Sequence, residues 1–265
     1  MTNSSLTTIT AKPAPEETQS CWSCGTMRAV HFCEACGKVQ PPKPVDYFTF
    51  FGLPRKLNLD TAALDRDFYD LSRKLHPDLS VRAGSQEQEW SLQQSSLLND
   101  AHRTLKDPIK RTQYLLKLEG VELEEQSKTA TEQARSSGQI KKQIVPPDLL
   151  EEVFEFNMQL EEARKLTETE RALDRNSSQR LSECDPALTE DLRQHKREFE
   201  AKHDVLLHEL ENRWKIWDGM IQRENNGQPV SDEERRQERE KMVDVLNRRN
   251  YIRNLVRDVN EVLEN

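Results

Sequence analysis

The spacing of hydrophobic residues predicts helices along most of the chain. Ahead of residue 76, apolar side chains recur at intervals of 4, 3 and 4, which places Leu64, Phe68, Leu71 and Leu75 on one helical face. Asp60 or Thr61 would cap this helix. A second helix is expected from about Ser85 to Lys106, where Asp107-Pro108 ends it, and a short helix follows to Leu118. We therefore predict a compact helical domain at residues 46–118.

The C-terminal half shows three further helical stripes. At about 100° per residue, each stripe forms one apolar face. The first contains Leu149, Val153, Phe156, Leu160 and Ala163; the second Leu188, Leu192, Phe199, Leu206, Leu210 and Trp217; the third Val245, Ile252, Val256, Val259 and Leu263. Interruptions are expected around Asn176–Pro186 and Asn225–Glu234. Three such helices predict an antiparallel bundle over residues 148–265.

Several large apolar residues lie away from these stripes. Leu150, Phe154 and Met158 form a second line on the first C-terminal helix, and Tyr251 lies about 100° from the stripe of the last helix. A neighbouring helix or the preceding domain would cover them if they belong to the core. If they are exposed, they form an apolar patch for a partner. The sequence pattern leaves both interpretations open.

Composition narrows the class of protein. The 265 residues are 34% hydrophobic and 32% charged, and only 8 are glycine, which favours an all-α fold over a sheet-rich one. The net charge of −8 argues against a general nucleic-acid binder. No run approaches the ~18 apolar residues of a membrane span. We therefore expect neither nucleic acid nor a membrane among the partners.

Two segments have little helical pattern. Residues 1–20 are rich in Ser and Thr and carry two glutamates but no arginine, so they are predicted to be disordered or a residual targeting segment. Residues 119–147 are polar and contain the stretch ARSSGQ, which predicts a flexible linker.

Four of the five cysteines are clustered near the N-terminus. Cys21, Cys24, Cys33 and Cys36 form two C-x2-C pairs separated by eight residues, while Cys184 stands alone. Each pair suits a tight turn, and two turns can arrange four sulfurs tetrahedrally around zinc. Iron in the same cage and redox-active thiols remain alternatives. A closed four-thiolate site has no open coordination position, so the predicted zinc is structural. The clustering also favours a reducing compartment over a disulfide framework.

The cysteine module, residues 21–40, is expected to be structurally separate from the helical domain. The stretch QPPKP, Gln40 to Pro44, predicts a stiff linker. We therefore expect separate cores, with residues 46–265 folding without the metal. His31 lies between the cysteine pairs, but with four cysteines available it is interpreted as a bystander rather than a ligand.

The tripeptide His76-Pro77-Asp78 ends the first helix of the hairpin. Pro77 cannot continue the helix and pushes His76 out of helical geometry. Basic residues precede the loop on the side of the helix opposite the apolar face: Arg66, Arg73 and Lys74. Taken alone, the tripeptide fits an ordinary helical hairpin with a chance sequence in its loop.

The surrounding sequence resembles a J-domain. The stretch DYFTFFGLP looks like the opening of that domain, and LNDAHRTLKDP with RTQYLLKL looks like its end; His102 stands where the family usually has tyrosine. The resemblance implies that the loop and the basic helix dock on a DnaK-type chaperone and trigger ATP hydrolysis. It further implies that Asp78 pairs with an arginine of the chaperone, that Pro77 holds the loop shape, and that His76 fixes its local hydrogen bonds.

The same resemblance gives the basic residues a role. Arg66, Arg73 and Lys74 would steer the helix toward an acidic surface, in a contact that weakens with salt. The chain shows no Gly-rich phosphate loop, so no nucleotide site of its own is expected.

The whole arrangement resembles the HscB-type iron–sulfur co-chaperones. YLLKLEG, a linker and a C-terminal helical bundle follow the J-domain-like region, and the four-cysteine module looks like that of animal-type eukaryotic members. The resemblance covers residues 21–265, with an apparent insertion at Asp218–Lys241. It implies a mitochondrial matrix location, a mitochondrial DnaK-type chaperone and an IscU-type scaffold as partners, and no enzymatic activity. A homodimer is left open.

The resemblance also assigns the second apolar line. Leu150, Phe154 and Tyr251 match scaffold-binding positions of the family, Glu151 departs from an apolar position, and Met158 is a candidate to compensate.

Two alternative functions are a general J-protein for unfolded clients and a zinc-dependent or redox enzyme that uses the cysteine module. Binding to many denatured proteins would favour the first. A metal with an open coordination position or a reactive thiol would favour the second.

Overall fold

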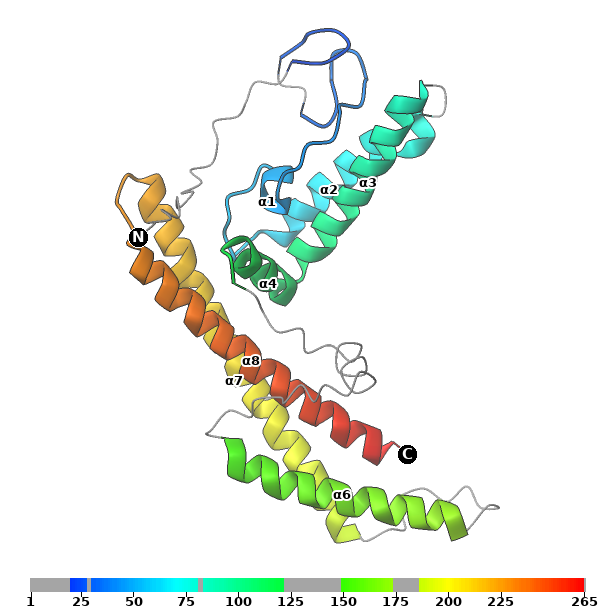
Figure 1. Ribbon diagram of the computed structural model, residues 1–265, viewed down its shortest axis with the longest axis vertical. Helices are drawn as coiled ribbons and strands as arrows, with labels where there is room; N and C mark the ends of the chain where they lie inside the picture. Colours follow the sequence, from blue (N-terminus) through cyan, green and yellow to red (C-terminus); the bar gives the residue numbers. More distant parts are fainter. Residues whose placement is uncertain (1–19, 28–29, 81–82, 122–148, 174–185, 265) are drawn as a thin grey trace, which may run out of the picture. The chain divides into compact units, whose positions relative to one another are not determined.

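The computed structural model describes residues 20–27, 30–80, 83–121, 149–173 and 186–264 (Figure 1). The chain divides into two compact units, Met1–Glu119 and Gly120–Asn265. Within the described residues there are seven α-helices, a short 3-10 turn and two isolated β-bridges, so the all-α prediction is confirmed. The predicted N-terminal segment and linker, together with Cys184, lie almost entirely outside the described residues. None of the helices in the described ranges combines the length and apolarity that a membrane crossing requires.

The first unit is a helical hairpin with two short helices beside it. Its helices and the 3-10 turn η1 run α1 Tyr47–Phe50, α2 Thr61–Leu75, η1 Pro77–Ser80, α3 Ser85–Lys106 and α4 Pro108–Leu118. The predicted start and stop signals act as expected. The Asp60 carboxylate accepts from the backbone N–H groups of Ala62 and Ala63, both at 3.0 Å, and so caps α2. Asp107 caps α4 in the same way, with Pro108 in the first helical turn.

α2 and α3 pack antiparallel, and α1 and α4 both contact α3 (Figure 1). The apolar face of α2 buries Leu64 and Leu75, while Phe68 and Leu71 are half-buried. α1 and α4 are joined by stacking of Tyr47 on Tyr114, with ring centroids 4.4 Å apart. The Tyr47 backbone N–H also donates to the Tyr114 hydroxyl at 3.0 Å. These contacts hold the two short helices beside the hairpin.

The cysteine module shares the hydrophobic core of the hairpin. Val39 is buried with Phe50, Leu75, Leu98 and Ala101, and Phe32 packs on the same cluster. The expectation of separate cores is therefore wrong. The physical reason is size, because a module of about 20 residues has too little apolar surface to form a core alone. Gln40, the first residue of the expected linker, is fully buried.

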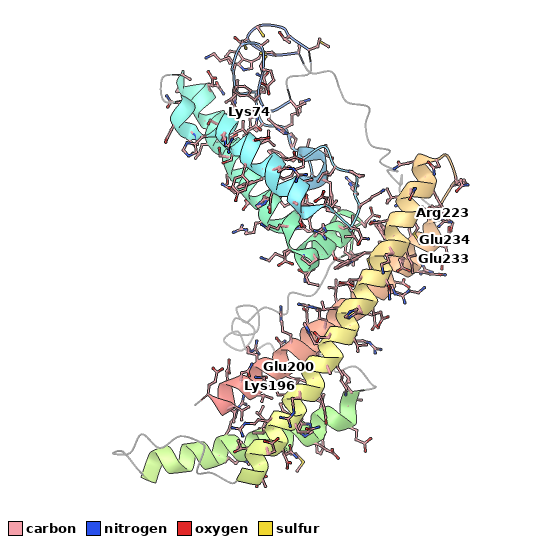
Figure 2. The ribbon with its side chains drawn as sticks, turned by 180° about the vertical axis from the view of Figure 1, so that it is seen from behind. Lys74, Lys196, Glu200, Arg223, Glu233 and Glu234 are labelled. Atoms are coloured by element: carbon pink, nitrogen blue, oxygen red, sulfur yellow. The ribbon has the colours of Figure 1, made fainter. Side chains whose placement is uncertain are left out.

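The second unit consists of three helices: α6 Leu150–Leu173, α7 Pro186–Asn225 and α8 Asp232–Leu263. α7 and α8 form a long antiparallel pair, which α6 contacts near the start of α7 (Figure 1). The stretch Asp218–Lys241, identified as an insertion, forms the end where α7 turns into α8. Gly227 adopts φ 77° in this turn, and Ser231 and Glu234 form a capping box. Arg223 forms an ion pair with Glu234 here, with 3.3 Å between Nη2 and Oε1. Figure 2 labels both residues.

The predicted stripes of α6 and α7 are buried almost throughout. All five residues of the α6 stripe are buried, and on α7 only Leu188 is half-buried. On α8, Val245, Ile252 and Val259 are buried as expected, but Val256 and Leu263 are half-buried. Tyr251, Leu255 and Val262 are buried in addition. α8 contacts both α6 and α7, so its buried face is wider than a single stripe.

Candidate functional site

The His76-Pro77-Asp78 loop begins where α2 ends. His76 has the extended backbone expected before proline, with φ −61° and ψ 129°. The Asp78 backbone N–H donates to His76 Nδ1 at 3.3 Å, and the Asp78 carboxylate lies 3.5 Å from the same nitrogen. Both side chains are exposed. The loop therefore presents an imidazole and a carboxylate side by side to solvent.

Two serines of α3 hold the loop from behind. The Leu75 carbonyl, the last of α2, accepts from Ser91 Oγ at 2.8 Å and from Ser95 Oγ at 2.7 Å. A carbonyl at a helix end lacks an intrahelical partner, so these hydroxyls satisfy it. The sequence analysis missed both residues. The available signal was a pair of serines four positions apart, which share one helical face.

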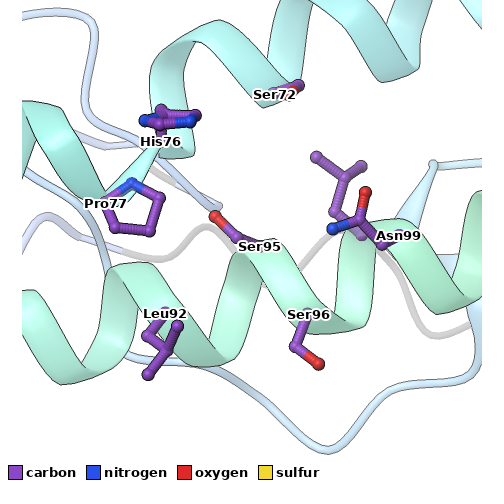
Figure 3. A pocket seen from close by; sticks show the side chains of 8 residues that line it. Ser72, His76, Pro77, Leu92, Ser95, Ser96 and Asn99 are labelled. Atoms are coloured by element: carbon purple, nitrogen blue, oxygen red, sulfur yellow. The ribbon is translucent and has the colours of Figure 1, made fainter.

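A groove of about 450 Å³ lies between the loop and α3. Figure 3 shows His76, Pro77 and Ser72 on one side and Leu92, Ser95, Ser96 and Asn99 on the other. Leu92 is 62% exposed. The groove thus offers an apolar side chain next to the exposed imidazole and carboxylate, an arrangement suited to contact with another protein.

The basic residues of α2 are placed differently from one another. Arg66 and Arg73 are exposed on the helix surface. Lys74, labelled in Figure 2, forms an ion pair with Glu34 of the cysteine module. The structure therefore keeps the two arginines on the open face of the helix and brings the lysine into contact with the module.

His102 joins α3 to α2. Its ring stacks on Phe68 with centroids 4.0 Å apart, and Nε2 lies 2.7 Å from Asp65 Oδ1. Lys106 also pairs with Asp65, at 2.9 Å. The hydrogen bonds from His102 and Lys106 lower the pKa of the Asp65 carboxyl. His102 thus supplies both an aromatic contact and a polar link across the hairpin.

The four N-terminal cysteines converge on one point. Their sulfurs all lie within 4.8 Å of one another, with Cys21 to Cys36 at 3.6 Å and Cys24 to Cys33 at 3.7 Å. A tetrahedral zinc site with Zn–S of about 2.3 Å has S–S edges of about 3.8 Å. A disulfide would instead require about 2.05 Å. The four sulfurs therefore fit a metal ion.

The two cysteine pairs adopt the same turn. Gly25 has φ 73° and donates to the Cys21 carbonyl at 2.9 Å, while Gly37 has φ 71° and donates to the Cys33 carbonyl at 2.8 Å. A positive φ is costly for any residue with a side chain. Glycine after each pair is therefore what allows both turns to close.

The thiols differ in acidity. Burial opposes ionisation of Cys21, yet hydrogen bonds from the backbone N–H groups of Cys24 and Ser23 lower its pKa to about 6. Burial raises the pKa of Cys36 to about 12, and its cysteine neighbours add to the effect. Four adjacent thiols cannot all ionise without a compensating cation. Binding of a metal would take all four as thiolates and release their protons.

His31 faces the hairpin instead of the sulfurs. Its Nδ1 lies 2.9 Å from Gln94 Oε1, and its Nε2 lies 2.9 Å from the Phe50 carbonyl oxygen. Both ring nitrogens are thus occupied by groups of α3 and α1. His31 has a positioning role that the sequence did not indicate.

The second apolar line lies on the surface of α6. Leu150, Phe154 and Met158 are 52%, 67% and 61% exposed, and their spacing of four places them along one side of the helix. Tyr251 is only 6% exposed, so the expectation that it belongs to an exposed patch is wrong. Its burial also raises the pKa of its hydroxyl.

Comparison with known proteins gives the relatives of this chain. No protein-family model matches it. An iron–sulfur cluster co-chaperone protein HscB homolog of Arabidopsis thaliana is 34% identical over 149 residues, which are 56% of this chain and 53% of that protein. This chain resembles the HscB co-chaperones. Iron–sulfur cluster co-chaperone protein HscB of Mus musculus is 38% identical over 111 residues, which are 40% of this chain and 47% of the mouse protein.

The HscB resemblance extends to the fold. The crystal structure of human co-chaperone protein HscB matches with a TM-score of 0.56 and 22% identity, covering 92% of this chain and 98% of the human one. The sequence matches span about half the length of the two curated HscB relatives.

Proposed function

We propose that this chain is a J-domain co-chaperone of iron–sulfur cluster biogenesis. It binds an IscU-type scaffold through its second unit and presents it to a DnaK-type chaperone, whose ATP hydrolysis it stimulates through its first unit. The observation that carries the proposal is the exposed His76–Asp78 pair at the end of a helix that also exposes Arg66 and Arg73, in a chain similar to HscB co-chaperones. Stimulated hydrolysis promotes transfer of the cluster from the scaffold.

The chaperone contact uses the loop and α2. Asp78 supplies a carboxylate for an arginine of the chaperone, and charge-assisted pairs of this kind are among the stronger hydrogen bonds. His76 accepts from the Asp78 backbone N–H and so keeps the carboxylate in place. Arg66 and Arg73 steer the helix toward an acidic surface. The nucleotide and the catalytic groups belong to the chaperone, and this chain acts as an activator without chemistry of its own.

The scaffold contact uses the exposed side of α6. Leu150, Phe154 and Met158 form an apolar line, while the opposite stripe of the same helix is buried in the bundle. One face of α6 therefore holds the fold and the other is available for the scaffold. Tyr251 supports the bundle from within and is left out of the proposed contact surface.

The cysteine centre holds zinc in this proposal. Four thiolates complete a tetrahedral zinc site and leave no position for a substrate, so the metal is structural. The mitochondrial matrix, where the proposed chaperone and scaffold work together, is the proposed location. Both assignments follow from the HscB resemblance and the donor set.

Single-turnover ATP hydrolysis by the chaperone tests the proposal. The chain should accelerate hydrolysis, and the scaffold should increase the effect. His76→Gln should abolish stimulation without altering the helical circular dichroism. His208→Gln, which changes an exposed histidine of α7, should stimulate as well as the unaltered chain. Full activity of His76→Gln would contradict the J-domain assignment. Equal stimulation by scaffold and by unrelated denatured proteins would instead favour a general J-protein.

A further inference from the structure

A buried glutamine connects the cysteine centre to the rest of its unit. Gln40 Nε2 donates to Cys21 Sγ at 3.4 Å and to the Lys38 carbonyl at 2.8 Å. Its Oε1 accepts from the Trp22 backbone N–H at 3.4 Å. The residue is 0% exposed. Its side chain therefore bridges the two cysteine turns and reaches one of the sulfurs directly.

The connection continues into α3 and α1 through Gln94. The side-chain Nε2 of Gln94 donates to the Gln40 carbonyl at 2.7 Å, and its Oε1 lies 2.9 Å from His31 Nδ1. His31 in turn reaches the Phe50 carbonyl at the end of α1. Gln94 is 1% exposed. A continuous set of hydrogen bonds thus runs from a sulfur through the module into two helices.

A second set of contacts reinforces the first. Glu87 of α3, itself buried, accepts from Lys38 Nζ at 2.8 Å and from the Val39 backbone N–H at 3.3 Å. Trp22 donates its indole N–H to the Val39 carbonyl at 2.8 Å and packs edge-on against Trp90 at 5.6 Å. Buried polar groups of this kind are costly when they lose their partners. The module and α3 therefore depend on each other.

Metal binding is what folds a module of this size. Small four-cysteine modules depend on the metal for their fold, because the bound ion replaces a hydrophobic core. Without the metal, the turns that place Gln40, His31 and Val39 against the hairpin lose their main support. Gln94, Glu87 and the Phe50 carbonyl would then lose their partners together.

We propose that Gln40 and Gln94 couple metal occupancy of the cysteine centre to the stability of α1 and α3. Metal bound at the four sulfurs stabilises the helical unit, and an intact interface with α3 tightens metal binding by the same factor, since linkage is reciprocal. The cysteine module is thus an integral support of the hairpin that carries His76. This inference stands apart from the chaperone assay, because it concerns folding and metal affinity alone.

Hydrogen exchange of the full chain tests the coupling. The protein is prepared reduced with one equivalent of zinc, confirmed by elemental analysis, and compared with a chelator-treated sample. Exchange in peptides from α1 and α3 should rise about fivefold or more after metal removal, which is the lower end of typical coupling between sites. Peptides from α7 and α8 serve as the internal reference and should not change. Unaltered exchange in α1 and α3 would overturn the proposal without any substitution being needed.

Metal affinity measured by competition with a chromophoric chelator tests the named residues. Gln40→Ala should weaken zinc binding about 10–100-fold, as is typical when a partner of a metal ligand is removed. Gln94→Ala should also weaken it, although Gln94 lies on α3. Gln93→Ala is the matched control, because its side chain bonds Glu89 on the surface at 3.0 Å, and it should bind zinc normally. Wild-type affinity of Gln94→Ala would refute the coupling.

Discussion

Glu34, in the turn between Cys33 and Cys36, forms an ion pair with Lys74 of α2, two residues before His76. The pair neutralises one of the three cations expected to steer the chaperone toward the loop. Glu34 is exposed, so the pair contributes little to stability. Its effect is expected on the rate of association with the chaperone, because a charge at the edge of a contact surface mainly changes that rate.

Glu34→Gln should therefore speed association with the chaperone. With Lys74 released, the rate at low salt should rise about two- to fivefold, the range that corresponds to an exposed ion pair. The gain should vanish at high salt because the charges are screened. Glu211→Gln makes the same change of charge at an exposed position of α7 and should have no effect. Stopped-flow rates that are identical for Glu34→Gln and the unaltered chain would show that Lys74 has no steering role.

Removal of both serine hydroxyls behind the loop should impair stimulation of the chaperone. In Ser91→Ala/Ser95→Ala the Leu75 carbonyl loses two donors, and each lost hydrogen bond costs about 1 kcal/mol of stability. The loop then relaxes from its position beside α3, so the maximal rate of stimulated ATP hydrolysis should fall. Ser85→Ala, at an exposed position of α3 outside the groove, is the control. If the double variant still reaches the full maximal rate, these serines do not position the loop.

The hydrogen bond between His102 and Asp65 should affect how the free energy of unfolding of the first unit changes at acid pH. The folded state lowers the pKa of Asp65 below its ordinary value of 3.8, so its stabilising contribution is present above that pH and is lost as the pH falls through the lowered value. His102→Phe keeps the stacking on Phe68 but removes one hydrogen bond to Asp65. The urea midpoint of the first unit, followed through NMR signals of α2 and α3, should therefore depend less on pH below about 4.

His208→Phe, at an exposed position of α7, provides the comparison for this titration. It should leave the pH dependence of the first unit unchanged. If His102→Phe and the unaltered chain lose stability in parallel on acidification, the hydrogen bond does not hold the carboxylate in its ionised form.

Truncating the apolar line on α6 should weaken scaffold binding, whereas truncating Tyr251 should lower stability. Leu150→Ala/Phe154→Ala/Met158→Ala should weaken scaffold binding about thirtyfold or more, as expected for loss of an interface anchor of ~2 kcal/mol. Each exposed position should change the free energy of unfolding by no more than about 0.5 kcal/mol. Tyr251→Ala should instead cost about 2–5 kcal/mol of stability, because it empties a buried site. Calorimetry with the scaffold and urea unfolding measure the two effects.

Val205→Ala gives a matched control for the apolar line. Val205 is 67% exposed on α7, so its truncation removes exposed apolar surface from the same unit away from α6. It should bind the scaffold normally. A triple α6 variant that binds as well as Val205→Ala would place the scaffold site elsewhere.

Features that depend on neighbouring residues could be predicted from the sequence. Asp60, Pro77 and Asp107 set helix ends through capping and through the geometry of proline, which act within a few positions. The spacing of the cysteines likewise predicted the cluster of sulfurs, because each C-x2-C turn is local. The stripe of α6 was predicted in full for the same reason, since helical period alone decides which residues share a face.

Which helical faces meet depends on long-range packing. Gln94 and His31 are 63 positions apart, and nothing in their local patterns indicates that they hydrogen bond. The pairing of Glu34 with Lys74 spans 40 positions in the same way. Tyr251 lies off the predicted stripe of α8, yet it is buried. Periodicity assigns a residue to a side of its own helix, whereas the partner that covers that side depends on how distant segments pack.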